Sequence, residues 1–339
     1  GSRIAQVHNG SSLFTGDAGQ GESNIRRWII ENDWLEAIIA LPENMFYNTG
    51  IATYIWVLSN RKSALRQGQV QLIDASELCT ALRKNLGSKN CELSAEHIAE
   101  ITELFLECKE SDISKIFPNQ AFGYWKVSVD RPLRLAVDLS PARLERFERV
   151  CAKAKEESLV SLALRMAKTL GAGPYLDFNA FMQAVEADAA EHDIKLIAKR
   201  KKLLQTELCD TNETAAPVLK KIHKAGKVFP DPVHGLFEAK VNGKPCVVEY
   251  EPDTALRDSE QVPLLEEGGI EAFFRREVLL YTPDAWIDPT KTQVGYEISF
   301  TRHFYKPAPM RSLGEIRAEL LELQQEGEGL LEEIVGHEA

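Results

Sequence analysis

The sequence predicts an α/β protein in which strands near the N-terminus precede a mainly α-helical region with a β-hairpin and a long C-terminal helix. Residues 35–41 and 51–58 are short, nearly continuous apolar runs on either side of the loop 42–50. Such runs are typical of strands that are covered on both faces of an α/β sheet. Over 139–228 and 312–335 the apolar residues instead recur at helical spacing, which predicts helices.

The bulk properties narrow the class of protein. The chain has 339 residues and a formal net charge of -11, so its whole surface is not a basic nucleic-acid footprint. No apolar run approaches the ~20 residues of a membrane span, and we expect a cytoplasmic protein. Gly1-Ser2 resembles a remnant of cloning, and strand-like sequence follows at once, which suggests that the chain begins inside a fold element. The cysteines lack the spacing of a zinc site, so we expect reduced thiols and no metal at Cys79, Cys91, Cys108, Cys151, Cys209 and Cys246.

The first elements have the layout of a phosphate-binding site. Residues 3–13 predict a strand that runs into the glycine-rich loop 14–21, and residues 22–31 predict a helix. Gly16, Gly19 and Gly21, however, do not have the spacing of a known phosphate-binding motif. A nucleotide-binding enzyme therefore remains an alternative beside a flexible loop that caps a sheet.

The middle of the chain predicts a strand at 70–75, a loop at 81–91 and a helix with Ser94 as its N-cap. Residues 122–132 alternate as a strand does. Basic residues in and after this strand are candidates for contact with a DNA backbone, although their stems also suit a solvated strand: Lys126, Arg131 and Arg134.

The second half predicts helices, a hairpin and a heptad seam. Residues 139–228 are helical in pattern, with a third helix from about 187 to 208. Asn242-Gly243 predicts the turn of a hairpin over 236–250. Ser312 and Glu315 form a capping box before a seam that is interrupted at Gly327. The seam predicts a subunit interface, or else packing on the chain's own helices, through Leu313, Ile316, Leu320, Leu323, Leu330 and Ile334.

A family resemblance rests on several segments. Residues 41–53, Leu-Pro-Glu-Asn-Met-Phe-Tyr-Asn-Thr-Gly-Ile-Ala-Thr, resemble a segment late in the methyltransferase domain of the modification (M) subunit of type I restriction-modification systems. Leu13-Phe14, the glycine-rich loop and Ile25-Arg26 match the same family, as does the Arg-Pro-Leu-Arg at 131–134. Further blocks lie in order between 249 and 311. The resemblance covers roughly 3–75, 120–135 and 249–335.

The resemblance implies the C-terminal part of a Rossmann-like methyltransferase sheet. The parent protein would methylate adenine N6 in DNA with S-adenosylmethionine, in a complex with a specificity subunit, a second M subunit and a restriction subunit, and without a membrane. By resemblance, Phe46 and Tyr47 line the target-base pocket, although both residues also suit the cover of a sheet edge. The expected domains are terminal methyltransferase strands (1–80), a connecting region (81–138), a helical region (139–228), a hairpin and family-specific region (229–311) and the heptad helix (312–335).

Two motifs of that family are missing from the chain. Its members bind the cofactor with Phe-x-Gly-x-Gly and hold the target amine with Asn-Pro-Pro-Phe/Tyr, and neither occurs in the 339 residues. We therefore expect no catalytic residue, no bound S-adenosylmethionine and no methyl transfer by this chain alone. A sheet without its central strands would leave an open edge that associates. The alternative function is a non-catalytic helical module that assembles through the 312–335 helix.

Overall fold

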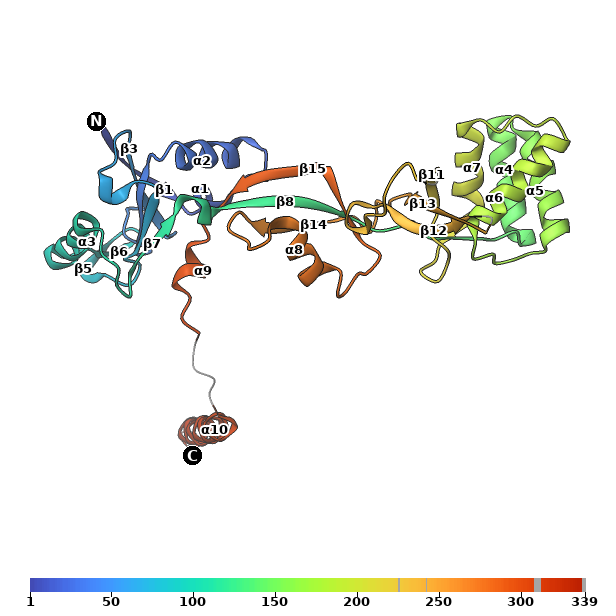
Figure 1. The fold of residues 1–339 in the computed structure, drawn as a ribbon. Coiled ribbons are helices and arrows are strands. Elements are labelled where there is room, and N and C mark those ends of the chain that lie inside the picture. The colour runs from blue at the N-terminus through green and yellow to red at the C-terminus, as the bar shows by residue number, and fades with distance from the viewer. Residues whose placement is uncertain (225, 242, 308–311, 337–339) are drawn as a thin grey trace. The chain divides into compact units, whose positions relative to one another are not determined.

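The computed structural model describes all residues except 225, 242, 308–311 and 337–339, and no side chains from residue 328 onward. The chain divides into two units, Gly1–Ile298 and Ser299–Ala339 (Figure 1). Among the described residues, none of the helices combines the length and the apolar character that a bilayer crossing requires.

Strands from the first 118 residues form one mixed sheet. They are β1 Arg3–Asn9, β2 Leu35–Leu41, β3 Thr53–Ser59, β4 Gln69–Asp74 and β7 Ser114–Pro118. Their order is β1-β3-β2-β4-β7, in which β2 and β4 run parallel and the other neighbours run antiparallel. Every residue of β2 is buried, as a continuous apolar run predicts. The predicted strands at 35–41, 51–58 and 70–75 are confirmed, while the Rossmann-like arrangement stays a prediction.

Helices accompany this sheet. The short helix α1 (Ser11–Phe14) occupies the end of the segment 3–13, expected to be a strand running into a loop, and α2 (Gly21–Glu31) confirms the helix predicted at 22–31. Helix α3 (Ala95–Glu107) begins as predicted, because the Ser94 hydroxyl accepts a hydrogen bond of 3.2 Å from the His97 amide. Its buried residues join the apolar cluster of the central strands, so α3 covers one face of the sheet.

The loop predicted at 81–91 is wrong, because this segment is a hairpin of β5 (Thr80–Leu86) and β6 (Lys89–Glu92). The turn contains Gly87 with φ of 61°, a left-handed conformation that glycine adopts at little cost. Both strands are largely exposed, so they lack the alternation of apolar and polar residues that marks a strand with one buried face.

A second antiparallel sheet follows, in the order β14-β8-β15. Its strands are β8 Gly123–Asp130, β14 Asp258–Pro263 and β15 Trp286–Tyr296. Strand β8 confirms the strand predicted over 122–132. Helix α8 (Gly269–Phe273) leads into a π-helical turn, Phe274–Val278, whose Phe274 is fully buried against the sheet residues Val127 and Ile287.

The helical region is shorter than predicted. Its helices are α4 Pro141–Ala154, α5 Glu157–Leu170, α6 Phe178–Glu191 and α7 Ala198–Leu208, which share one apolar core. The single helix expected from 187 to 208 is wrong, because α6 ends at Glu191 and Asp193 takes the left-handed φ of 50°. Beyond Leu208 the chain is extended, where β10 (Cys209–Thr211) pairs with β9 (Leu135–Val137).

A third sheet contains the predicted hairpin. Its strands are β11 Leu219–His223, β12 Phe237–Val241 and β13 Lys244–Tyr250, in the order β11-β13-β12. Gly243 has φ of 74°, as the predicted turn requires, whereas Asn242 lies outside the described residues. The hairpin is confirmed by the register in which Val241 faces Lys244.

The second unit contains α9 (Phe300–Phe304) and α10 (Leu313–Gly336). The Ser312 hydroxyl accepts a hydrogen bond of 3.2 Å from the Glu315 amide, and the Glu315 carboxylate accepts one of 2.7 Å from the Ser312 amide. These two bonds form the predicted capping box. Side chains of the seam are exposed at Leu313, Ile316, Leu320 and Leu323, whereas those of Leu330 and Ile334 lie outside the described part of the chain.

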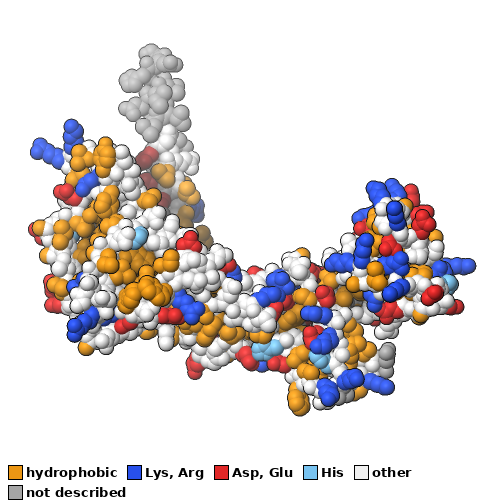
Figure 2. Space-filling model, turned by 90° about the horizontal axis from the view of Figure 1, so that it is seen from above, with side chains coloured by type: hydrophobic (Ala, Val, Ile, Leu, Met, Phe, Trp, Pro, Cys, Tyr) orange, Lys and Arg blue, Asp and Glu red, His pale blue; other side chains and the backbone are white. Residues whose placement is uncertain are grey.

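Strand β1 forms one end of the first sheet, where it is paired with β3 alone among the described strands. Its Ile4 and Val7 side chains are 58% and 48% exposed. An apolar cleft of about 460 Å³ lies beside it, lined by Trp56 of β3 and by Ile25 and Ile29 of α2. Figure 2 shows hydrophobic side chains gathered on the surface of the sheet-bearing part at the left. The edge is therefore open to a further strand.

Candidate functional site

The loop 42–50 joins β2 to β3 and directs its two aromatic residues outward. Met45 packs against the core of the sheet, while Phe46 and Tyr47 are 37% and 68% exposed. Asn44 and Asn48 both take left-handed φ values, 55° and 54°, which asparagine tolerates better than most residues. The loop is thus anchored by one side chain and shaped by two turns, so that both rings face solvent.

The β5–β6 hairpin forms one wall beside this loop. The Asn90 amide donates a hydrogen bond of 3.1 Å to the Asn44 carbonyl, and the Cys91 thiol donates one of 3.2 Å to the Glu43 carbonyl. At the tip of the hairpin, a Cβ on Gly87 would lie 3.0 Å from the Tyr47 ring. Loop and hairpin therefore form one continuous surface, although 30 or more residues separate them in the chain.

The predicted DNA-backbone cations are all paired, and two of them, Arg131 and Arg134, lie together while Lys126 has a separate partner. Lys126 is 2.5 Å from the Asp17 carboxylate, and this hydrogen bond holds the pKa of Asp17 below its ordinary value. Arg131 and Arg134 share one carboxylate, at 3.4 and 3.1 Å from Asp284. Each of these cations already has an anionic partner, so a phosphate contact would have to compete with that carboxylate.

The glycine-rich loop 14–21 is fixed by contacts with Arg26 of α2 and with Gln293 of β15. The buried guanidinium of Arg26 donates hydrogen bonds of 2.7 Å to the carbonyls of Thr15 and Tyr296. A Cβ on Gly19 would lie 2.9 Å from the Gln293 side chain of β15. The loop thus packs on the second sheet, a role that the sequence did not reveal because the contacts come from residues more than 250 positions away.

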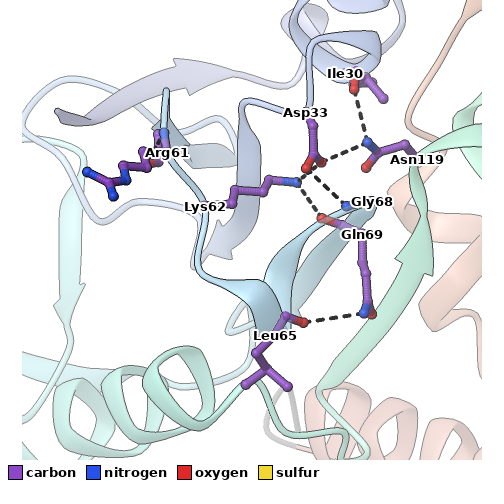
Figure 3. A network of polar contacts seen from close by, with 9 residues as sticks. Ile30, Asp33, Arg61, Lys62, Leu65, Gly68, Gln69 and Asn119 are labelled. Carbon is purple, nitrogen blue, oxygen red and sulfur yellow. Dashed lines mark hydrogen bonds and ion pairs between the residues drawn. The ribbon is translucent and has the colours of Figure 1, made fainter. Parts of the chain in front are cut away.

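A polar network fixes the turn between α2 and β2 (Figure 3). The Lys62 ammonium lies 2.6 Å from both Asp33 Oδ1 and the Gln69 carbonyl, and Asn119 donates to Asp33 over 2.9 Å. Burial by itself raises the pKa of Asp33, but the hydrogen bonds from Lys62, Asn119 and the Gly68 amide hold it below its ordinary value. Burial lowers the pKa of Lys62 against the pull of Asp33. The charged groups of the network, Asp33 and Lys62, are paired within the protein, which favours a structural role, although the buried Asn119 Oδ1 has no hydrogen-bond partner.

Comparison with known proteins gives one consistent family. Residues 1–128 match the family model described as N-6 DNA Methylase. The methylase subunit of the type I restriction enzyme MjaIX from Methanocaldococcus jannaschii is 31% identical over 128 residues, 37% of this chain and 22% of that protein. The methylase subunit of the type I restriction enzyme HindI from Haemophilus influenzae is 34% identical over 110 residues, 32% of this chain and 23% of that protein.

The matched part is short in each of these relatives. A crystal structure of the type I restriction-modification methyltransferase subunit from Streptococcus thermophilus matches 35% of this chain and 24% of its own, with 24% identity and a TM-score of 0.31, an extent too small to establish a shared overall fold. The chain spans about a fifth of the length of the curated relatives it matches. The resemblance over 249–335 stays a prediction. Residues 1–128 thus match the N-6 DNA methylase family model, and the resemblance to the modification subunits of type I restriction-modification systems is confirmed.

Proposed function

We propose that this chain is part of a type I modification subunit, a DNA adenine-N6 methyltransferase that uses S-adenosylmethionine. The observation that carries the proposal is the loop 42–50, which lies inside the segment that matches the N-6 DNA methylase family and presents two exposed aromatic rings. A methyltransferase must take its target base out of the duplex, and aromatic side chains stack on the extruded base. We assign that stacking to Phe46 and Tyr47.

The residues present do not fit the cofactor. The chain has neither Phe-x-Gly-x-Gly nor Asn-Pro-Pro-Phe/Tyr, and its glycine-rich loop is occupied by contacts with Arg26, Lys126 and Gln293. A buried guanidinium beneath that loop also disfavours the positively charged sulfonium of S-adenosylmethionine. The cofactor and the target amine would be held by other parts of the parent protein, and this chain by itself would transfer no methyl group.

The test uses the complete protein of which this chain is a part, with its specificity subunit, and follows methyl transfer to a duplex substrate. Loss of a stacking ring is worth about 1–3 kcal/mol, so Phe46→Ala and Tyr47→Ala should each lower kcat/KM by about 5- to 150-fold. Tyr47→Phe should retain most of the activity, because the ring remains.

The matched control for that test is Phe229→Ala, which removes an aromatic ring that is 88% exposed and lies outside the loop. It should leave kcat/KM unchanged. Equal losses in the control and in the loop variants would contradict the assignment. The 339-residue chain alone should give no methyl transfer, and detectable transfer would show that the two motifs are not needed.

A second candidate function, assembly, is favoured by the exposed seam of α10. Leu313, Leu320 and Leu323 are 86%, 62% and 61% exposed. Apolar side chains at steps of three and four form a stripe that is normally buried by packing against a second helix. We propose that this helix contacts the specificity subunit, and that the second M subunit, the restriction subunit and DNA join the same complex. This function does not exclude the first.

A further inference from the structure

We propose that the β5–β6 hairpin binds the phosphate backbone of DNA beside the target-base loop, through Arg83, Lys84 and Lys89. The hairpin is attached to the loop 42–50 by the hydrogen bonds of Asn90 and Cys91, and Gly87 at its tip lies so near the Tyr47 ring that an added Cβ would be 3.0 Å from it. A nucleotide stacked on the loop would therefore have its neighbouring phosphates next to the hairpin.

The charge of the hairpin favours phosphate. Residues 80–92 contain these three cations and one carboxylate, Glu92, in a chain whose formal net charge is -11. The backbone of loop 42–50 brings one further carboxylate nearby, that of Glu43, which is exposed. The hairpin is thus a local positive surface on an acidic protein, and cations that neutralise phosphates supply the sequence-independent part of DNA binding.

The cations of the hairpin are also available. In the part of the chain that the structure describes, Arg83, Lys84 and Lys89 form no ion pair, whereas Lys126, Arg131 and Arg134 are held by Asp17 and Asp284. Strands β5 and β6 are exposed along most of their length. Cations without a carboxylate partner can neutralise a phosphate without first breaking an ion pair.

The hairpin has no evident role in the core. Only Cys91 among its strand residues is buried, and Leu86 next to the tip is 56% exposed. A two-stranded hairpin is marginally stable by itself, so its attachment to the loop holds it in place. An exposed hairpin that adds little to the core is well placed to contact a partner, here DNA.

The experiment measures binding of the 339-residue chain to a fluorescent DNA duplex by anisotropy, without S-adenosylmethionine, at salt concentrations between about 50 and 200 mM. Replacement of Arg83, Lys84 and Lys89 by Gln should weaken binding on the order of tenfold at the lowest salt. It should also make the slope of log K against log salt shallower by about 3, one for each lost phosphate contact. Each single substitution should change the slope by about 1.

The matched control removes the same charge elsewhere, by replacing Lys224, Lys227 and Lys240 with Gln. These lysines are exposed and lie in and beside the third sheet. The control should retain the slope of the unchanged chain. Equal losses in both triple variants, or unchanged binding after substitution of the hairpin, would overturn the proposal, as would absence of binding by the unchanged chain at the lowest salt. The thermal midpoint of each variant shows that it is folded.

This inference rests on the proposed function only for the identity of the loop as the base pocket. The base pocket and the hairpin contact can be tested separately in the complete protein, with duplex DNA that carries 2-aminopurine in place of the target adenine. The fluorescence of 2-aminopurine rises when the base leaves the stack. Hairpin-dependent binding without a rise in 2-aminopurine fluorescence would refute the base pocket and leave the hairpin contact standing. A fluorescence rise that survives the triple substitution, with unchanged affinity, would refute the hairpin contact alone.

Discussion

Asp33 lies in the turn between α2 and β2 with a left-handed φ of 57°. Its carboxylate accepts hydrogen bonds from Lys62 and from the Gly68 amide in the network of Figure 3. The sequence predicts the helix and the strand on either side, but not this network. Lys62, whose side chain is 1% exposed, reaches Asp33 from a loop that follows β3. Because water does not reach this buried ammonium to replace its partner, removal of either Lys62 or Asp33 would leave the other charge uncompensated.

At this scale we predict that Lys62→Met lowers the free energy of unfolding by about 2 kcal/mol. The change leaves the Asp33 carboxylate without its cation, and breaking a buried pair by removal of one partner costs about 3–5 kcal/mol; the 30% exposure of Asp33 reduces that cost. Urea unfolding followed by tryptophan fluorescence measures it.

The effect of Lys62→Met on the free energy of unfolding should depend on pH. In the unchanged protein the pKa of Asp33 is lowered, so its contribution to stability is present at neutral pH and is lost as the pH falls through the folded-state value. Without Lys62, one of the hydrogen bonds that lower the pKa of Asp33 is lost together with the charge of Lys62, so that the pKa of Asp33 should be higher than in the unchanged protein. The difference in the free energy of unfolding between the unchanged protein and Lys62→Met should therefore become smaller as the pH falls below about 4. Arg61→Met, which removes the neighbouring exposed cation that points away from the network, is the control (Figure 3).

Among the elements, α10 shows most clearly a helix whose pattern needs a partner. We predict that Leu320→Glu together with Leu323→Glu weakens binding to the specificity subunit of the same system by at least about tenfold, because two charges would enter an apolar seam. Calorimetric titration of the 339-residue chain measures the change. Gln325→Glu places one carboxylate on the opposite side of the helix and should bind as the unchanged chain does. Unaltered binding by the double variant would instead favour packing of the seam within the chain.

On the scale of the whole molecule, the open edge at β1 predicts association. Strand β1 carries exposed Ile4 and Val7 and has neither the proline nor the bulge that commonly protects an edge, while its cation Arg3 pairs with Glu36 at the start of the strand. Light scattering at rising concentration should show particles larger than one chain, and Val7→Lys should reduce their mass. A monomeric chain at high concentration would contradict the prediction. If the particles persist in Val7→Lys but are lost in the Leu320→Glu, Leu323→Glu variant, the chains associate through the seam of α10 rather than through β1.

Much of the local structure could be predicted from the sequence. The apolar runs of β2 and β4, the capping residues Ser94 and Ser312, and the hairpin around Gly243 depend on neighbours in the chain, so their patterns are readable there. The misplaced helix end at Glu191 and the overlooked β5–β6 hairpin are polar segments, where periodicity is too weak to separate helix, strand and loop.

By itself, then, the sequence determined the α/β class, most elements, the resemblance of its first 128 residues to the N-6 DNA methylases and the position of the aromatic pair 46–47 in a loop. Only the tertiary structure decided which cations have partners. Lys126 meets Asp17, and Arg131 and Arg134 meet Asp284. The hairpin whose tip at Gly87 lies near Tyr47 carries Arg83, Lys84 and Lys89, which form no ion pair among the described residues. The physical reason is that an ion pair depends on distance in space, and these partners lie more than 100 positions apart in the chain.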